Sequence, residues 1–358
     1  MWVSYFLIYM GITKLNEVRL KEHKGVLIIS GLFGLLNASG MYLYRRDALP
    51  KLTVIQLALF FAYAVVYAIA FLLVWKVFEY CASRMRVGVS ASGVTDTGDL
   101  AGNIWDRHTF LICFLAIMAG WAIWIISYYP ASMEWDVYDP IRQYIGQTTP
   151  TDHHPWFYVC VVGAAYSFGE KIGDKNVGIF IYMIIRDLIM AAIYARCVVM
   201  LHRHGLKKRI VLLVLAFYSI TPVWGAYAKH AFKDAIGAAL FCWFIEAIVL
   251  LVLDKMKHEQ ASVGICAEIA IASLLACLFR HNNFYAICPV LILAVIIILK
   301  KEKSIKTAVL LLSGLILFSG YHYYIINIEG ITPTSMGEAL AIPLQQTART
   351  VKYDSDST

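Results

Sequence analysis

Charged side chains are scarce in this chain of 358 residues, of which only 15% are Asp, Glu, Lys or Arg. Soluble globular domains carry about 25% charged residues. Because 60% of the residues are hydrophobic and the mean hydropathy is +0.67, the composition excludes a water-soluble globule, a disordered chain and a DNA-binding domain. The net charge of +7 is better explained by the cytoplasmic loops of a membrane protein, where Lys and Arg gather, than by a nucleic-acid partner.

The chain also lacks any CxxC pair among its eight cysteines, and most of these lie within apolar runs, where Cys behaves as a small hydrophobe. The spacing therefore predicts neither a disulfide framework nor a cysteine metal site. The N-terminal sequence MWVSYFLIYM has no basic segment and no small-residue cleavage site of a signal peptide. We expect this segment to be retained.

Long apolar runs recur from end to end, and they predict an all-α, polytopic transmembrane helical bundle. A crossing helix needs about 20 apolar residues. We expect nine or ten transmembrane helices, from runs at 2–12, 25–44, 53–78, 109–129, 177–201, 210–226, 232–253, 262–279, 284–299 and 306–328.

The basic residues predict how these helices are oriented. Two sets of loops alternate along the chain, and one set holds seventeen Lys and Arg whereas the other holds eleven. The positive-inside rule places the richer set in the cytoplasm. That set comprises loops 13–24, 79–108, 202–209, 254–260 and 300–306.

This orientation decides how the stretch 156–168 is interpreted. If it crossed the membrane, the basic loop 202–209 would lie outside and every later loop would invert. We therefore expect it to lie on the outer leaflet, or to dip into it and return, so that 130–176 is one long external loop with membrane-parallel helices. The chain then divides into N-terminal helices with a cytoplasmic loop, a catalytic transmembrane core and an external tail, at 1–108, 109–328 and 329–358.

Asp136 is the first candidate catalytic residue in this external loop. It follows the run 109–129 by a few residues, so it is expected at the membrane surface near Trp135 and Tyr138. Partial desolvation raises the pKa of a carboxylate at such a position, which suits a general base. The alternative is that Asp136 only caps a short helix at 137–146, which on residue type alone is the commoner role.

The pair His153 and His154, followed by Pro155, is the second feature of the loop. These imidazoles suit hydrogen bonding to a phosphate, metal binding with Asp136 or Asp152, or a polar turn before a helix opened by the proline. Adjacent residues on a regular element point in different directions, so both seldom bind one ion. Half of the ten histidines are predicted on the outer side, namely His153, His154, His230, His281 and His322.

Further cations are predicted on the same side of the membrane. Lys229 and Lys233 are four residues apart and therefore share one face of a helix. Asp234 follows directly, so Lys233 and Asp234 are alternatively a simple charge pair at a helix end. Arg280 and His281 lie in the next outer turn, although basic groups at a membrane surface attract anionic headgroups in any case.

Arg186 and Asp187 lie inside the apolar run 177–201. Charges within a membrane span are costly and are a functional-site hypothesis by default, but these two alternatively pair with each other or with neighbours. The predicted outer face thus offers a carboxylate, histidines and cations, whereas the other face offers ordinary basic loops. This asymmetry favours an enzyme that acts on a lipid phosphate at the outer leaflet.

A family resemblance is carried by the order of these features. An acidic residue just after an early span, a long external loop, a His-Pro element and then a span containing Arg resemble the GT-C glycosyltransferases, notably the protein O-mannosyltransferase type. From Phe110 onwards the chain also looks like a bacterial multi-pass family of unassigned substrate with that presumed fold. The segments that carry this likeness are WDVYDPIRQ, DHHPWFY, the KDA of AKHAFKDA, RHNN and IPLQQTAR.

The resemblance implies transfer of a sugar from a polyprenyl-phosphate-linked donor to a glycan or protein acceptor, outside a bacterial plasma membrane and with inversion. Asp136 matches the catalytic acid that activates the acceptor, and His153, His154 and Pro155 match the His-Pro element. The predicted catalytic residues are Asp136, Asp139, His153 and His154. The cations and histidines predicted to bind the donor phosphate are Lys229, His230, Lys233, Arg280, His281 and Arg186.

The sequence departs from the pattern of these enzymes in three respects. Asp136 is followed by Val137 and not by a second acid, the next acid being Asp139, and three extra apolar segments precede the expected core. The chain stops at KYDSDST, where relatives tend to continue into an external domain, so a truncated form is expected. No metal site is assigned, and whether a divalent metal assists stays open.

Two other functions remain as alternatives. A transporter or flippase for lipid-linked or anionic solutes would show inverted repeats and helices interrupted by Gly or Pro at mid-membrane. The sequence has no convincing internal repeat, and Pro222 and Pro289 are expected near span ends. A non-catalytic assembly or polymerase-like membrane subunit is the third hypothesis.

Overall fold

The structure is a computed structural model that describes residues 24–44, 53–91, 104–255 and 260–334, with residues 345, 347–349 and 352 near the C-terminus. The chain divides into two compact units, one of Met1–Val94 with Ser335–Thr358 and one of Thr95–Thr334. Apart from two isolated β-bridges, all regular structure in the described residues is helical, as predicted. The run expected at 2–12 and most of the tail lie outside the described residues.

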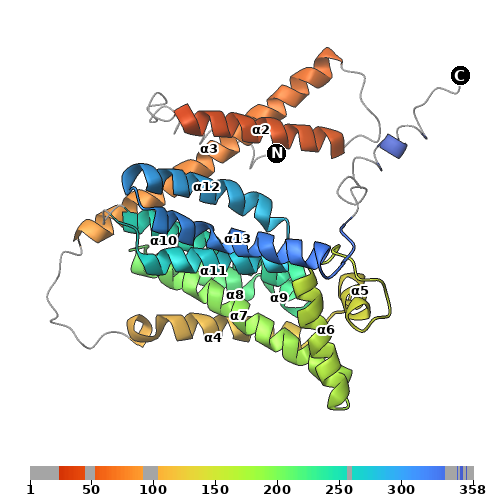
Figure 1. The fold of residues 1–358 in the computed structure, drawn as a ribbon. Helices are drawn as coiled ribbons and strands as arrows, with labels where there is room; N and C mark the ends of the chain where they lie inside the picture. The colour runs from red at the N-terminus through yellow and green to blue at the C-terminus, as the bar shows by residue number, and fades with distance from the viewer. Residues whose placement is uncertain are drawn as a thin grey trace, which may run out of the picture. The chain divides into compact units, whose positions relative to one another are not determined.

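The smaller unit contains helices α2 (Lys24–Tyr44) and α3 (Val54–Ala91), drawn in red and orange in Figure 1. They pack against each other, with the rings of Phe33 and Phe71 5.2 Å apart and Gly34 against the backbone of Ala64. Two of the predicted apolar runs therefore form helices. The helix α3 continues thirteen residues beyond the predicted end of its run, into the segment expected as a cytoplasmic loop.

The larger unit is a helical bundle with a small helical layer at one end (Figure 1). Each apolar run predicted from residue 109 onwards forms a helix or a bent pair of helices in it. Its elements are α4 (Ile104–Ser127), α5 (Trp135–Tyr144), α6 (Trp156–Lys171), α7 (Lys175–Arg203), α8 (Lys208–Ile220), α9 (Pro222–Lys229), α10 (Lys233–Lys255), α11 (Val263–Phe279), α12 (Asn283–Lys301) and α13 (Ile305–Asn327).

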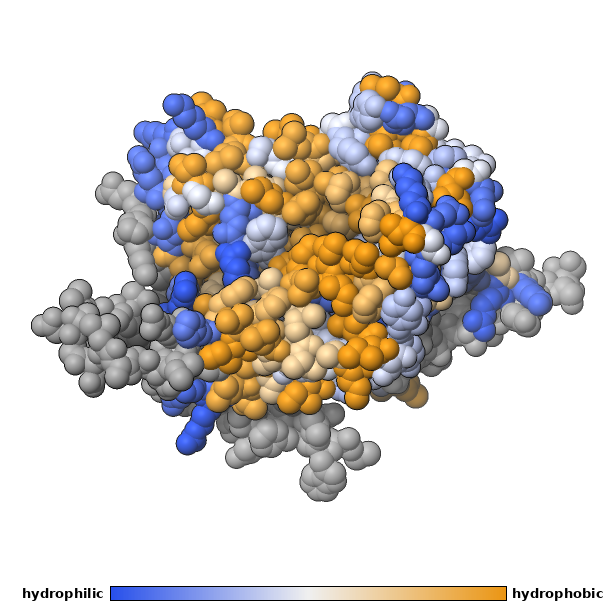
Figure 2. Space-filling view, turned by 90° about the horizontal axis from the view of Figure 1, so that it is seen from below, coloured by the Kyte–Doolittle hydropathy of each residue, from blue (hydrophilic) through white to orange (hydrophobic). Residues whose placement is uncertain are grey.

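Five of the described helices are long and apolar enough to cross a membrane, namely α4 from His108, α7, α10, α12 and α13. The pair α8 and α9, bent by 42° where Pro222 begins the second helix, would be a sixth. Within the described part of the chain the predicted count of nine or ten is not reached, partly because the 17 residues of α11 extend about 25 Å, less than the hydrocarbon core. Figure 2 shows apolar residues across the middle of one face, with hydrophilic residues on both sides.

Close helix contacts in the core of the bundle depend on small residues. The indole of Trp121 in α4 is fully buried and donates a hydrogen bond of 2.9 Å to the Tyr218 carbonyl in α8. The close approach of α4 to α8 requires glycine at position 120, because a Cβ atom there would overlap the Ser219 carbonyl oxygen. The pair α4 and α8 is thus held at backbone contact distance.

Gly120→Ala is expected to destabilise the protein by about 1–3 kcal/mol, because the added methyl group forces α4 and α8 apart. The midpoint of thermal unfolding of the full chain in detergent measures this effect. Gly320→Ala is the matched control, since nothing lies within 4 Å of the added atom and alanine favours a helix by up to about 1 kcal/mol. Equal unfolding midpoints for both variants would contradict the proposed contact.

The two ends of the bundle are each held together by polar contacts. At one end, Lys255 Nζ lies 2.6 Å from Glu302 Oε1, and the Glu302 carboxylate also accepts a hydrogen bond from the Ala261 N–H. The loops predicted at 254–260 and 300–306 therefore share one end, as the positive-inside argument requires. The predicted external loops meet at the opposite end, where α5 and α6 lie.

The helix α6 does not pass through the bundle. The helix begins just after His154, which contacts Lys233, and it packs against α5 and α7. The chain then returns along α7 to the same end of the bundle, where Arg186 donates a hydrogen bond to the His230 carbonyl. The turn back is tight, since a Cβ atom at Gly178 would overlap the Ala165 carbonyl oxygen. As predicted for 156–168, α6 is not among the helices suited to cross a membrane.

Candidate functional site

The helix α5 places two carboxylates at the end of the bundle. Val137, Pro140 and Ile141 are buried, with Val137 and Ile141 against α6 and α7, whereas Asp136 is exposed and Asp139 is partly exposed. Asp136 and Asp139 are three residues apart and therefore share a face of the helix. Glu134 occupies the N-cap position, so Asp136 lies in the first turn and does not cap the helix, contrary to the capping alternative.

The Asp136 carboxylate is exposed. Among the described residues it has no hydrogen-bond or ion-pair partner, but its charge acts on both His154 and Lys233. The Tyr158 hydroxyl, which donates to the Ala231 carbonyl, also lies 3.4 Å from the backbone carbonyl oxygen of Asp136. The backbone of Asp136 thus contacts α6, while its carboxylate oxygens remain open to a substrate.

Asp139 lies on the same face of α5 but is engaged by its surroundings. Its Oδ2 accepts a hydrogen bond of 2.7 Å from the Gln143 amide, and the His154 Nε2 atom lies 3.9 Å away. The Gln143 carbonyl oxygen in turn accepts from the Thr151 N–H at 3.0 Å. Gln143 therefore ties the acidic helix to the loop that carries the histidine pair.

His154 is fully buried and contacts Lys233 at the start of α10, with 2.9 Å between His154 Nδ1 and Lys233 Nζ. Burial lowers the pKa of His154 to about 4, and the positive charges of Lys233 and His153 act in the same direction. The imidazole is therefore neutral at pH 7 and accepts a hydrogen bond from the ammonium group. His153 is exposed, with its ring edge-on to that of His154 at 4.7 Å.

Arg280 supplies a second cation beside Lys233. Its Nη1 lies 3.2 Å from Asp234 Oδ1, and its charge acts on Lys233. Asn283 fixes the turn by donating to the Ala276 carbonyl at 2.9 Å. The structure thus pairs Asp234 with Arg280 of another element, which differs from the predicted pairing with its neighbour Lys233.

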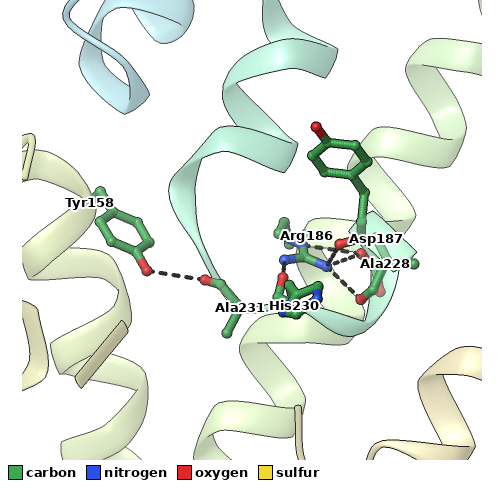
Figure 3. A network of polar contacts seen from close by, with 7 residues as sticks. Tyr158, Arg186, Asp187, Ala228, His230 and Ala231 are labelled. Atoms are coloured by element: carbon green, nitrogen blue, oxygen red, sulfur yellow. Dashed lines mark hydrogen bonds and ion pairs between the residues drawn. The ribbon is translucent and has the colours of Figure 1, made fainter. Parts of the chain in front are cut away.

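A buried network anchors the connection between α9 and α10, as Figure 3 shows. Arg186 is only 2% exposed and donates to Asp187 and to the carbonyls of Tyr227, Ala228 and His230. These bonds occupy its guanidinium group, so the geometry gives Arg186 a structural position and no opening toward a donor phosphate.

Tyr158 anchors the same connection from α6. Its hydroxyl donates to the Ala231 carbonyl at 3.1 Å, and burial raises the pKa of the phenol well above its usual value (Figure 3). The hydroxyl therefore remains protonated and a donor. The connection that leads into Lys233 is thus fixed by two buried side chains from different helices, Arg186 and Tyr158.

Lys229 and His230 lie on the side of the connection nearest the end of α4. The Lys229 ammonium group lies 3.8 Å from the centre of the Tyr128 ring, and His230 Nδ1 lies 3.1 Å from the Glu134 carboxylate. Burial lowers the pKa of His230, and the Glu134 charge opposes this shift. These two residues therefore flank the contact between His154 and Lys233 and do not join it.

His281 belongs to a separate group with Asp152 and His322. The Nδ1 atoms of both histidines lie 3.5 Å from Asp152 Oδ2. This group adjoins the rest of the site along the chain, because Asp152 precedes His154 by two residues and His281 follows Arg280.

The comparison with known proteins concerns the part of the chain that holds this site. Residues 126–358, more than half of the chain, match a family of unknown function, DUF6020. The chain belongs to this family. No curated protein and no solved structure matches it. The part shared with the DUF6020 family begins near the end of α4 and includes every candidate site residue, from Asp136 to His322.

Within this DUF6020 segment, the structure brings Asp136, Asp139, His154, Lys233 and Arg280 together. Of the other predicted residues, His153 is adjacent, Lys229 and His230 flank the group, Arg186 is buried beneath it, and His281 lies in the group of Asp152. The sequence indicated no role for Gln143 or Tyr158. The signal for Gln143 was its spacing of four from Asp139, whereas nothing in the sequence marks Tyr158.

Proposed function

We propose that this protein is a membrane glycosyltransferase that moves a sugar from a polyprenyl-phosphate-linked donor to a hydroxyl or amine acceptor at the outer face. The observation that carries the proposal is the pairing of two unlike surfaces at one end of the bundle. The outward face of α5 presents Asp136 and Asp139, and the start of α10 with the turn after α11 presents Lys233 and Arg280. A base and a phosphate-binding pair are what such a transfer requires.

In the proposed reaction the acceptor oxygen or nitrogen attacks the anomeric carbon of the donor sugar. The new bond to this carbon forms as the bond to the phosphate oxygen breaks, and the electron pair leaves with the phosphate. Asp136 takes the acceptor proton, and Lys233 with Arg280 stabilises the charge on the departing phosphate. A lipid phosphate is already a good leaving group, so no general acid is needed.

His154 positions Lys233, one of the two proposed phosphate-binding cations. Because its imidazole is neutral, it orients the Lys233 ammonium group by accepting one hydrogen bond and leaves two N–H groups of that ammonium for a phosphate. Asp234 holds Arg280 in the same way through one ion pair. Both cations are therefore positioned before a donor binds.

The test of the proposal is whether the purified chain retains such a donor. Lipids extracted from the wild-type protein in mild detergent are expected to contain a polyprenyl-phosphate-linked sugar, identified by mass spectrometry. Lys233→Met is expected to reduce the retained donor about 10- to 100-fold, because a charge-assisted hydrogen bond is worth about 1.5–3 kcal/mol.

Lys207→Met is the matched control for this experiment. Lys207 is an exposed lysine between α7 and α8, at the other end of the bundle. Its loss is expected to leave the donor in place. Absence of any polyprenyl-linked sugar from the wild-type protein, or equal retention by Lys233→Met, would contradict donor binding at this site.

One observation favours the alternative of a transporter or flippase for lipid-linked or anionic solutes. Pro222 interrupts a span, so that α8 and α9 meet at an angle of 42°, whereas the sequence placed this proline near a span end. Inverted-repeat transporters carry such breaks in corresponding positions of two halves. Among the described residues the break between α8 and α9 has no counterpart, which favours the enzyme.

A further inference from the structure

We propose that Asp152, His281 and His322 form a binding site for a divalent transition-metal ion, with zinc as the best chemical match. The three residues come from the loop before α6, the turn between α11 and α12, and α13. One ligand atom from each lies within 4.8 Å of those from the other two. This site is separate from Asp136 and Lys233, and the proposal does not depend on sugar transfer.

The separation of Asp152 Oδ2 from each histidine nitrogen fits a shared ion better than a direct hydrogen bond. Asp152 Oδ2 lies 3.5 Å from Nδ1 of both His281 and His322. Normal N–H···O hydrogen bonds measure about 2.7–3.2 Å between these atoms. Two ligands held about 2.1 Å from one tetrahedral zinc ion lie about 3.4 Å apart, which is close to the observed separation.

One oxygen of the buried Asp152 carboxylate lacks a partner in the described part of the chain. It is 5% exposed, and its Oδ1 atom has no hydrogen-bond partner among the described residues. A buried carboxylate without compensation is costly, so such groups are paired, neutralised or bound to a metal.

The residue types select the class of metal. Two imidazoles with one carboxylate, and a further position left for water or a ligand, are typical of zinc and of related first-row metals. Calcium and magnesium prefer oxygen ligands and are disfavoured here. The ring of Phe318, one turn before His322, lies beside both histidines, with its centroid 5.8 Å from that of His281, and gives the site an apolar wall.

The surrounding backbone holds the carboxylate in place. The Asp152 N–H donates to the Thr332 carbonyl at 2.8 Å, and the Thr332 N–H donates to the Pro150 carbonyl at 3.2 Å. The loop is therefore paired with the segment that follows α13, the helix that carries His322. A bound metal would add a third link, to the turn of Arg280 and His281, and so fix the position of Arg280 relative to His154.

Metal analysis of the purified full chain tests this proposal. After equilibration with zinc and desalting, the wild-type protein is expected to hold about one zinc ion per chain. His322→Ala and Asp152→Asn are expected to bind zinc at least about tenfold more weakly. His204→Ala, at the other end of the bundle, is the matched control and should bind as the wild type does.

A gain-of-signal variant covers the case in which these substitutions impair folding. With cobalt in place of zinc, His322→Cys is expected to show a thiolate-to-cobalt charge-transfer band that the wild-type protein, with its own eight cysteines, does not show. The proposal is overturned if the wild type binds no zinc, if zinc binding is unaffected in both ligand variants, or if the folded His322→Cys protein gives no such band.

Discussion

Asp136→Asn is expected to lower the rate of sugar transfer by about 10²- to 10⁴-fold, which is the usual contribution of a general base. The amide has nearly the shape of the carboxylate but does not take the acceptor proton. The rate is measured with purified protein and a polyprenyl-phosphate-linked sugar, with the glycosylated product identified by mass spectrometry. Because the Asp136 carboxylate has no partner among the described residues, the variant is expected to fold and insert normally.

Two further variants test whether the loss of sugar transfer is specific to Asp136. Glu170→Gln removes an exposed carboxylate of α6 that pairs with Lys175 at 3.1 Å, away from the site, and is expected to leave transfer unchanged. Asp139→Asn disturbs the bonds to Gln143 and His154, so a smaller loss with a less stable loop is expected. Normal turnover by Asp136→Asn would remove this residue from the mechanism, and a larger loss in Asp139→Asn would transfer the role of base to Asp139.

The helices could be predicted from the sequence because hydropathy is a local property. Each predicted run from 109–129 onwards forms a helix or a bent pair, and α6 turns back as the charge bias of the loops required. The described residues contain fewer helices suited to cross a membrane than the runs predicted, because an apolar run does not reveal how many of its residues continue as one straight helix. The bend at Pro222 and the 17-residue length of α11 show this limit.

The site was only partly predictable, because its contacts join residues far apart in the chain. The sequence placed Asp136, His154, Lys233 and Arg280 on one side of the membrane, but the pairing of His154 with Lys233 spans 79 positions. The alternative prediction for Asp136, that it only caps a helix at 137–146, was also wrong. The N-cap role falls to Glu134, since the helix begins two residues earlier than expected.

The group of Asp152, His281 and His322 shows the same limit for a metal site. The sequence suggested metal binding by His153 and His154 with Asp136 or Asp152, although two adjacent residues seldom bind one ion. In the structure His153 is exposed and His154 contacts Lys233, whereas two histidines 41 positions apart meet at Asp152. Only packing of α13 against α11 and α12 brings these imidazoles to the same carboxylate.

Breaking the buried pair of Arg186 and Asp187 is expected to destabilise the protein by about 3–5 kcal/mol. Asp187 is fully buried and Arg186 is 2% exposed, so removal of one partner leaves an uncompensated charge inside the bundle. Asp187→Asn and Arg186→Met are the variants, and thermal unfolding in detergent is the measurement. Arg186→Met also frees the carbonyls of Tyr227, Ala228 and His230, so its effect is expected to be the larger.

The double variant Arg186→Met/Asp187→Leu separates this pairing from a general effect of substitution in α7. It removes both charges together, so it is expected to be less destabilised than Arg186→Met alone. Lys175 and Glu170, at the turn between α6 and α7, form an ion pair whose side chains are 49% and 56% exposed, and Lys175→Met should cost much less because water solvates the remaining carboxylate. Strictly additive losses in the double variant, or equal losses at both pairs, would show that the Arg186 network does not hold the connection that leads into Lys233.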